Sequence, residues 1–306
     1  IWEKTFGSAQ LDVGYRIVKS TDGNLFLLGA TEKANAGNRD IQLYKVDTDG
    51  NLIWEKSWGG AGQEIAETLI ETSNSEILIA ATTSSIGNGG RDIYLTWLSA
   101  QGNILREKTY GRSGDDGASD LLEIENGKLL VFGYTSSYGA TSRDFYLLQL
   151  NANGDSLWGK RYGGNDYEES WRIVKTKNNN YLLHGHSAKT DPNHNMYSVL
   201  VDSLGNTIWE REYGGSEHDG GHSALVNANG NFILLGRSMS FGQQRQMLFV
   251  ELSESGNLIT QEDFGTAKND WGNEIIEVGN SYYIVGHSDG FSDQGDNDGY
   301  LMRKLK

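Results

Sequence analysis

The chain has 306 residues, no cysteine, one proline and a formal net charge of −15 at pH 7. The absence of cysteine excludes disulfides and thiolate metal sites. The negative charge excludes nucleic acid as the main partner, because such a partner requires a basic face. No apolar run approaches the ~20 residues that a membrane-spanning helix needs, so we expect no membrane insertion.

The first 58 residues predict four short strands, over residues 14–19, 25–31, 40–46 and 52–58. Apolar side chains dominate each segment, and polar turn residues separate them. Asp22-Gly23 and Asp49-Gly50 supply the positive φ that tight hairpin turns require. A longer polar loop, ending at Arg39, connects the second segment to the third.

This pattern recurs along the whole chain with a period of 51 to 52 residues. An aromatic-Gly pair marks each repeat, at Phe6-Gly7, Trp58-Gly59, Tyr110-Gly111, Tyr162-Gly163, Tyr213-Gly214 and Phe264-Gly265. Four short antiparallel strands per repeat of this length are typical of a β-propeller blade. We therefore predict an all-β fold in which residues 1–306 form one six-bladed propeller, with four antiparallel strands in each blade.

The two ends of the chain predict how the ring closes. The last repeat stops after its third strand, whereas residues 1–6 read as a fourth strand with no third strand before it. We expect the N-terminal strand to complete the last blade, which removes the exposed edges of an open array. Because the chain starts inside a repeat, we also expect flanking domains of a larger protein.

The segment Val46-Asp47-Thr48-Asp49-Gly50-Asn51-Leu52-Ile53-Trp54 resembles the tryptophan-docking segment of quinoprotein-type propellers. The full repeat, with Trp-Glu-Lys followed by aromatic-Gly-Gly, is similar to repeats of secreted or surface propellers of bacteria. The resemblance implies an extracellular or cell-surface location. It does not imply quinone chemistry, because the adjacent cysteine pair of that family has no counterpart here. Tryptophans recur at Trp2, Trp54, Trp158 and Trp209, and we predict that they pack between blades.

Six acids stand five residues after the glycine of each aromatic-Gly pair, where the chain enters the innermost strand. They are Asp12, Glu64, Asp116, Glu168, Asp219 and Asp270. We expect them to line the mouth of the central channel. A cation site is one interpretation, and anchoring of the blade connections is the other, which we favour because the acids recur in every blade. Four repeats have an arginine at the start of the third strand, Arg39, Arg91, Arg143 and Arg245, and these arginines are candidate partners for the acids.

A ligand site should break the repeat symmetry, because a ligand is not repeated six times. Two positions near the channel keep no residue type, one after the small residue of the second strand and one on the innermost strand. From them we predict a ligand-binding patch of Tyr134, Trp171, Arg172, His186, His222 and Arg237. Ordinary surface and channel-filling residues are the alternative interpretation.

We find no nucleophile motif and no standard spacing of metal ligands, so we predict no catalytic residue, no metal and no cofactor. The favoured function is a non-catalytic binding or scaffold module for glycan or protein, using the face that carries the long loops. One alternative is a glycan-active hydrolase or lyase that uses the channel-mouth carboxylates. The other is a structural spacer within a larger surface protein.

Overall fold

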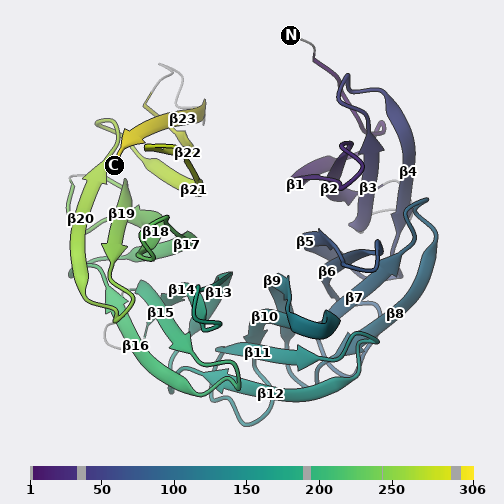
Figure 1. Cartoon of the computed structure of the whole chain (residues 1–306), viewed down its shortest axis with the longest axis horizontal. Coiled ribbons are helices and arrows are strands. Elements are labelled where there is room, and N and C mark those ends of the chain that lie inside the picture. Colours follow the sequence, from purple (N-terminus) through teal and green to yellow (C-terminus); the bar gives the residue numbers. More distant parts are fainter. Residues whose placement is uncertain (1–2, 33–38, 189–193, 243, 291–297) are drawn as a thin grey trace. The chain divides into compact units, whose positions relative to one another are not determined.

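The protein is a six-bladed β-propeller (Figure 1). The computed structural model describes residues 3–32, 39–188, 194–242, 244–290 and 298–306. It contains two compact units, Ile1–Ala140 with Tyr146–Arg161, and Thr141–Phe145 with Tyr162–Lys306. We call them unit 1 and unit 2 and describe each by itself. Trp2 lies outside the described residues.

Unit 1 contains three blades, each a sheet of four antiparallel strands in chain order. Their strands are β1 (Asp12–Lys19), β2 (Leu25–Thr31), β3 (Asp40–Val46), β4 (Leu52–Trp58), β5 (Glu64–Glu71), β6 (Ile77–Thr83), β7 (Asp92–Leu98), β8 (Ile104–Tyr110), β9 (Asp116–Glu123), β10 (Leu129–Thr135), β11 (Asp144–Leu150, whose first two residues belong to unit 2) and β12 (Ser156–Tyr162, whose last residue does). A short 3-10 helix, η1 (Glu125–Gly127), forms the turn between β9 and β10.

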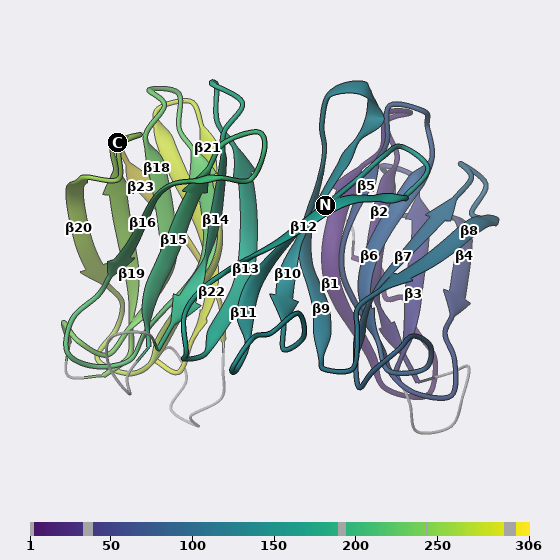
Figure 2. The ribbon, with the colours of Figure 1, turned by 90° about the horizontal axis from the view of Figure 1, so that it is seen from below.

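Unit 2 contains the other three blades. Their strands are β13 (Glu168–Lys175), β14 (Tyr181–Ser187), β15 (Asn195–Val201), β16 (Thr207–Tyr213), β17 (Asp219–Val226), β18 (Phe232–Ser238), β19 (Gln246–Leu252), β20 (Leu258–Phe264), β21 (Asp270–Val278), β22 (Ser281–Ser288) and β23 (Asp298–Leu305). Within each unit the first strands of neighbouring blades are in contact, β1 with β5 and β5 with β9, and β13 with β17 and β17 with β21. Figure 2 shows the strands of each unit running between two ends that carry the turns and loops.

The predicted strands of the first repeat are confirmed, except that β1 starts at Asp12 rather than at residue 14. It starts earlier because Asp12 and Val13 pair with Thr31 and Ala30 of β2. In every blade the pairing of the first two strands then shifts by one residue. Such a β-bulge leaves one residue of the innermost strand without a partner on the second strand. The bulged residues are Tyr15, Glu67, Ser119, Trp171, His222 and Asn273.

Apolar side chains between neighbouring sheets form the core of each unit. One cluster in unit 1 joins Phe26, Leu28 and Leu43 of the first blade to Ile77 and Ile79 of the second. A matching cluster in unit 2 joins β14–β16 to β17–β19. Burial of this apolar area between sheets is the main stabilising contribution to the fold.

Tryptophans of the outer strands pack on turns of the next blade. Trp54 packs against Phe26, with ring centroids 6.0 Å apart. A Cβ added to Gly102 would lie 3.1 Å from its ring. Trp209 is 8% exposed, and its indole N–H donates to the carbonyl oxygen of Glu254 at 3.0 Å. The turn residue beneath each indole must be small, and Gly102 also has a positive φ of 78°.

The last blade has three strands in the part of the chain that the structure describes, β21, β22 and β23. Residues 3–11 precede β1 and form no strand. The expected addition of residues 1–6 to the last blade therefore stays a prediction.

Candidate functional site

One cross-strand pair of positions distinguishes unit 2 from unit 1. The second residue of each innermost strand pairs with the sixth residue of the second strand, or with the seventh in the last blade, which gives Val13–Ala30, Ile65–Thr82, Gly117–Tyr134, Glu169–His186, Gly220–Arg237 and Trp271–His287. Unit 1 has mostly small or apolar residues here, whereas every pair of unit 2 contains a charged side chain or an imidazole. The candidate site therefore lies in unit 2.

Glu169 and His186 form a hydrogen-bonded dyad at the first of these pairs. Nε2 of His186 lies 3.1 Å from Oε2 of Glu169. A carboxylate only accepts hydrogen bonds, so Nε2 of His186 carries the proton. The other ring nitrogen, Nδ1, is buried and has no hydrogen-bond partner among the described residues. The dyad thus fixes the ring and leaves Nδ1 to a ligand.

Two further histidines reach this dyad from the loops that precede β15 and β17. The ring centroid of His194 lies 5.1 Å from that of His186 and 4.8 Å from that of His218. Nη2 of Arg237 lies 3.3 Å from Nε2 of His218. A guanidinium only donates, so Nε2 of His218 is the acceptor and this imidazole is neutral. We call Glu169, His186, His194, His218 and Arg237 the histidine–arginine site.

Gly220 leaves room in the middle of this site. A Cβ added to Gly220 would lie 3.4 Å from Nε of Arg237 and 3.7 Å from Nδ1 of His186. Both nitrogens are buried, and neither has a hydrogen-bond partner among the described residues. Buried polar atoms are nearly always hydrogen-bonded in folded proteins. Two such atoms facing the same glycine mark this point as one where an outside group can bind.

Two more arginines flank the histidine–arginine site, each held by an aromatic ring. Nη1 of Arg143 donates to the hydroxyl of Tyr167 at 2.9 Å, and that hydroxyl donates to Oε2 of Glu169 at 3.2 Å. The guanidinium of Arg245 lies 4.9 Å from the ring centroid of Trp271. The ring of His287 stacks on Trp271 at 4.3 Å. A cation–π contact orients Arg245 without neutralising its charge.

Burial and neighbouring charges set the protonation of these groups. The hydrogen bond from His186 lowers the pKa of Glu169 to about 2, so this carboxylate is ionised. Burial, with Arg237 beside it, lowers the pKa of His218 to about 4. Burial also lowers the pKa of His194, with a further contribution from His186. Burial and the charge of Arg245 lower the pKa of Arg237, although a guanidinium stays protonated at neutral pH.

The structure brings four of the six predicted ligand residues into contact with one another or with the histidine–arginine site. His186 and Arg237 belong to it. Trp171 and His222 are the bulged residues of β13 and β17, and their rings meet edge to face at 5.0 Å. Nδ1 of His222 lies 3.0 Å from the carbonyl oxygen of Gly272, and burial lowers the pKa of His222 to about 4.

The other two predicted ligand residues lie elsewhere. The guanidinium of Arg172 forms an ion pair with Glu274, which also accepts a hydrogen bond from Ser223 at 2.7 Å. Its charge is therefore largely neutralised within the protein. Tyr134 belongs to unit 1, where its side chain fills the space above Gly117.

The six recurring acids share one set of contacts. Each accepts a hydrogen bond from the backbone N–H four residues earlier, in the blade connection; the donors are Ser8, Gly60, Arg112, Gly164, Gly215 and Thr266. Five of the acids also accept from hydroxyl groups, those of Thr83, Thr135, Ser137, Ser187, Ser240 and Thr266. These donors are what the anchoring interpretation requires. In unit 2, Arg143 contacts Tyr167 and Arg245 contacts Trp271, as described above.

Sequence reasoning did not place Glu169, His194, His218, Arg245 and Trp271 in the candidate site. Glu169 and Trp271 belong to the series Val13, Ile65, Gly117, Glu169, Gly220 and Trp271, which varies as strongly as the series that identified His186 and Arg237. The variation of that series is the sequence signal that could have identified Glu169 and Trp271. His194 and Arg245 directly precede third strands, and only the fold brings them near His186 and Arg237.

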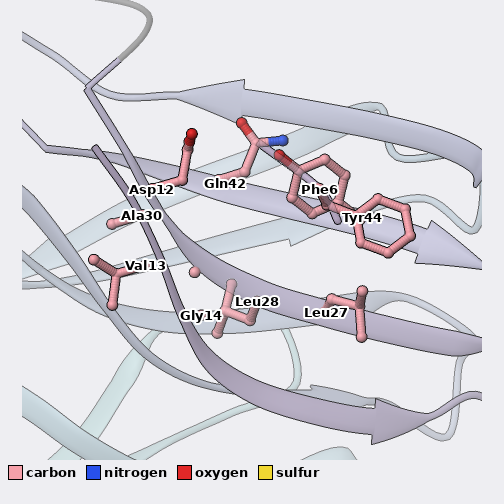
Figure 3. Close-up of a pocket in the computed structure, with 10 residues that line it drawn as sticks. Phe6, Asp12, Val13, Gly14, Leu27, Leu28, Ala30, Gln42 and Tyr44 are labelled. Atoms are coloured by element: carbon pink, nitrogen blue, oxygen red, sulfur yellow. The ribbon is translucent and has the colours of Figure 1, made fainter. Parts of the chain in front are cut away.

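A separate hollow lies on the first blade (Figure 3). It has a volume of about 200 Å³ and is lined mostly by apolar groups, including Phe6, Leu27 and Tyr44. The corresponding face of the second blade, with Ile79 in place of Leu27, packs against the first blade. The hollow is therefore a blade-packing face that no other element covers among the described residues of unit 1.

In the part of the chain that the structure describes, no group of three or more His, Asp or Glu side chains is arranged to hold a metal ion. None of the described helices is long and apolar enough to cross a membrane.

Comparisons with known proteins support the fold. A family model described as a β-propeller domain of unknown function, DUF5122, matches residues 125–155. No curated protein matches the sequence. Among solved structures, a polysaccharide lyase of family PL25, an ulvan lyase bound to -[GlcA(1-4)Rha3S]-, matches with a TM-score of 0.59 and 11% identity, over 94% of this chain and 77% of that one.

Two other solved structures show how varied the similar proteins are. A puromycin hydrolase matches with a TM-score of 0.55 and 13% identity, and the alignment covers 96% of this chain but only 43% of that one. The WD40 domain of Neurospora crassa Pan2 matches with a TM-score of 0.55 and 7% identity, over 96% of this chain and 79% of that one. Identities this low show a shared fold alone.

Proposed function

We propose that the protein is an extracellular or cell-surface binding module, and that its histidine–arginine site binds an acidic glycan through carboxylate or sulfate groups. One observation carries this proposal. Arg237 and Arg245 lie close enough for the charge of Arg245 to lower the pKa of Arg237. Within the described residues, neither guanidinium forms an ion pair with a carboxylate.

The charge of the whole chain makes this pair of arginines more informative. The net charge is −15, with 41 Asp and Glu residues against 26 Lys and Arg residues. Two guanidinium groups whose charges act on each other repel, and an anionic ligand relieves that repulsion. Guanidinium groups bind carboxylate and sulfate oxygens through charge-assisted hydrogen bonds, which are stronger than neutral ones.

Aromatic side chains next to the arginines favour a sugar over a simple ion. Trp171 is 38% exposed although it lies on an innermost strand, and its ring meets that of His222 at an angle of 68°. Sugar rings stack on such half-exposed aromatic faces. The similarity to a lyase whose structure contains a glucuronate-bearing saccharide agrees with this ligand class, as an analogy between folds.

Calorimetric titration with size-matched neutral, uronate-bearing and sulfated oligosaccharides tests the proposal. We expect binding of the acidic oligosaccharides only, weakened by salt. Arg237→Gln should reduce the affinity by roughly 10- to 100-fold, which corresponds to the loss of a charged hydrogen bond. Arg112→Gln is the matched control, because Arg112 stacks on Tyr138 in unit 1. Equal binding of neutral oligosaccharides, or full affinity in Arg237→Gln, would refute an acidic-glycan site.

A further inference from the structure

We propose that the histidine–arginine site cleaves a uronate-containing polysaccharide by β-elimination, with Arg237 holding the uronate carboxylate and His218 acting as the catalytic base. This inference rests on the proposed function, because it requires an acidic glycan at the same site. It goes further by assigning a reaction and the residues that perform it.

The chemistry of a uronate requires two groups side by side. The proton removed in β-elimination is on C5, the carbon that carries the carboxylate. The base must therefore lie next to the cation that binds the carboxylate. Nε2 of His218 lies 3.3 Å from Nη2 of Arg237, which meets this requirement.

The protonation of His218 also fits the role of a base. Because Nε2 accepts from Arg237, its lone pair is unprotonated at rest. When a carboxylate takes the N–H groups of Arg237, that lone pair is released toward the substrate. The positive charge of Arg237 helps to keep the pKa of His218 low. A bound carboxylate cancels that charge and so raises the basicity of His218. Substrate binding therefore both frees the base and strengthens it.

The remaining groups around His218 add little opposing charge. His194 packs against its ring at 4.8 Å, and His186 lies 6.2 Å away. Arg245 contributes a second positive field at the site. The one carboxylate of the histidine–arginine site, Glu169, is bonded to His186 and Tyr167 and does not contact Arg237. The guanidinium groups of Arg237 and Arg245 thus stabilise the negative charge that develops on the substrate carboxylate during the reaction.

The reaction balances without any cofactor or oxidant. Nε2 of His218 takes the C5 proton, and the electron pair of that C–H bond forms the C4=C5 double bond. The C4–O4 bond breaks, and its electron pair leaves on O4. The imidazolium of His218 then gives its proton to O4, which restores the neutral base. The products are a shortened chain and a 4,5-unsaturated uronate.

The test follows product and binding separately on the same polysaccharides. The unsaturated uronate absorbs in the near ultraviolet, whereas a hydrolysis product does not. We expect wild type to generate this absorbance on a 4-linked uronate polymer. His218→Gln should reduce the rate by at least about 100-fold, the usual contribution of a general base, while its affinity changes by less than about threefold. Arg237→Gln should lose both binding and turnover, and Arg112→Gln should lose neither.

The outcomes separate the two proposals. Binding of uronate polymers without any unsaturated product would overturn the elimination and leave the binding function intact. The absence of binding would overturn both. Full activity in a folded His218→Gln protein would overturn the assignment of the base. The pH profile gives a further check, because the rate should rise with pH as His218 loses its proton, and this acidic limb should be absent from the residual activity of His218→Gln.

Discussion

Asp40 and Glu64 face each other across Gly59 at the junction of the first two blades. A Cβ added to Gly59 would lie 2.1 Å from Oδ1 of Asp40 and 2.3 Å from Oε2 of Glu64. Both acids are buried, and burial together with the charge of Glu64 raises the pKa of Asp40. Two carboxylates this close in the interior repel each other unless they share a proton or a cation.

The same junction recurs with an informative substitution. Glycines of the aromatic-Gly pairs also separate Asp92 from Asp116, Asp144 from Glu168, Asn195 from Asp219 and Gln246 from Asp270. Two junctions thus have an amide where the other three have a second acid. An amide donates a hydrogen bond, as a protonated carboxyl does. Burial also raises the pKa of Asp92, and raises that of Glu168 to about 7. We infer that each acid pair holds one proton at neutral pH.

Asp40→Asn should therefore be tolerated and should flatten the dependence of stability on pH. A raised folded pKa means that the folded state holds a proton which the unfolded chain has released, so stability decreases as pH rises through that folded pKa. Denaturant unfolding between pH 5 and pH 9 should show this alkaline loss in wild type and less of it in Asp40→Asn. Asp47→Asn, in an exposed turn with a lowered pKa, should keep the alkaline loss.

If each acid pair holds a cation instead of a proton, added calcium should stabilise the protein. Calcium would then raise the melting temperature of wild type by mass action, and Asp40→Asn would abolish that rise. Such a result would overturn the shared proton.

The blade could be predicted from the sequence because its strands repeat in one register. Hairpin turns at Asp22-Gly23 and Asp49-Gly50 and alternating apolar residues set the strand limits locally. His186 and Arg237 could also be identified, since they break a repeated position. His194 and His218 could not, because they lie in loops whose paths depend on the bulges and on packing between blades. The acid pairs were missed as pairs because each joins residues of two different repeats.

Acidification should unfold unit 2 before unit 1. All six histidines lie in unit 2. Burial lowers the pKa of His184 to about 3 and those of His218 and His222 to about 4. The unfolded chain binds protons near the ordinary pKa of 6.5 and the folded chain does not, so stability falls as the pH drops from about 6.5 to 4.

Unit 1 has no histidine. The raised pKa of Asp40 and Asp92 in its acid pairs means that lowering the pH stabilises the folded state of this unit. Hydrogen exchange read by peptide mass spectrometry measures each unit separately. After correction for intrinsic rates, opening of unit 2 should increase by roughly tenfold or more between pH 7 and pH 5. Equal loss of protection in both units would contradict the prediction that the buried histidines of unit 2 cause the loss of stability in acid.

Gly220→Ala should weaken ligand binding without unfolding the protein. The new Cβ would occupy the space between Nε of Arg237 and Nδ1 of His186, at ordinary contact distances of 3.4 and 3.7 Å. No charge changes, so a loss of affinity of roughly tenfold or more would report steric exclusion of a ligand group. Gly14→Ala is the matched control on an innermost strand of unit 1, where an added Cβ meets nothing within 4 Å. Unchanged affinity in a folded Gly220→Ala protein would show that the ligand binds elsewhere.

Deleting residues 1–6 should destabilise the protein and promote self-association. Five large apolar side chains of the last blade, Ile276, Val278, Val285, Leu301 and Leu305, are between 48% and 71% exposed. Beyond β23 there is no fourth strand among the described residues, so the edge of that sheet is available for pairing. An exposed, apolar edge strand pairs with other chains when its own partner is missing. Light scattering and thermal melting of the truncated chain measure both effects. Thr5→Pro keeps the length of the chain but removes a backbone N–H, so it should reproduce part of the defect if residues 1–6 pair as a strand. A truncated protein that stays monomeric and melts as wild type does would show that these residues do not complete the last blade.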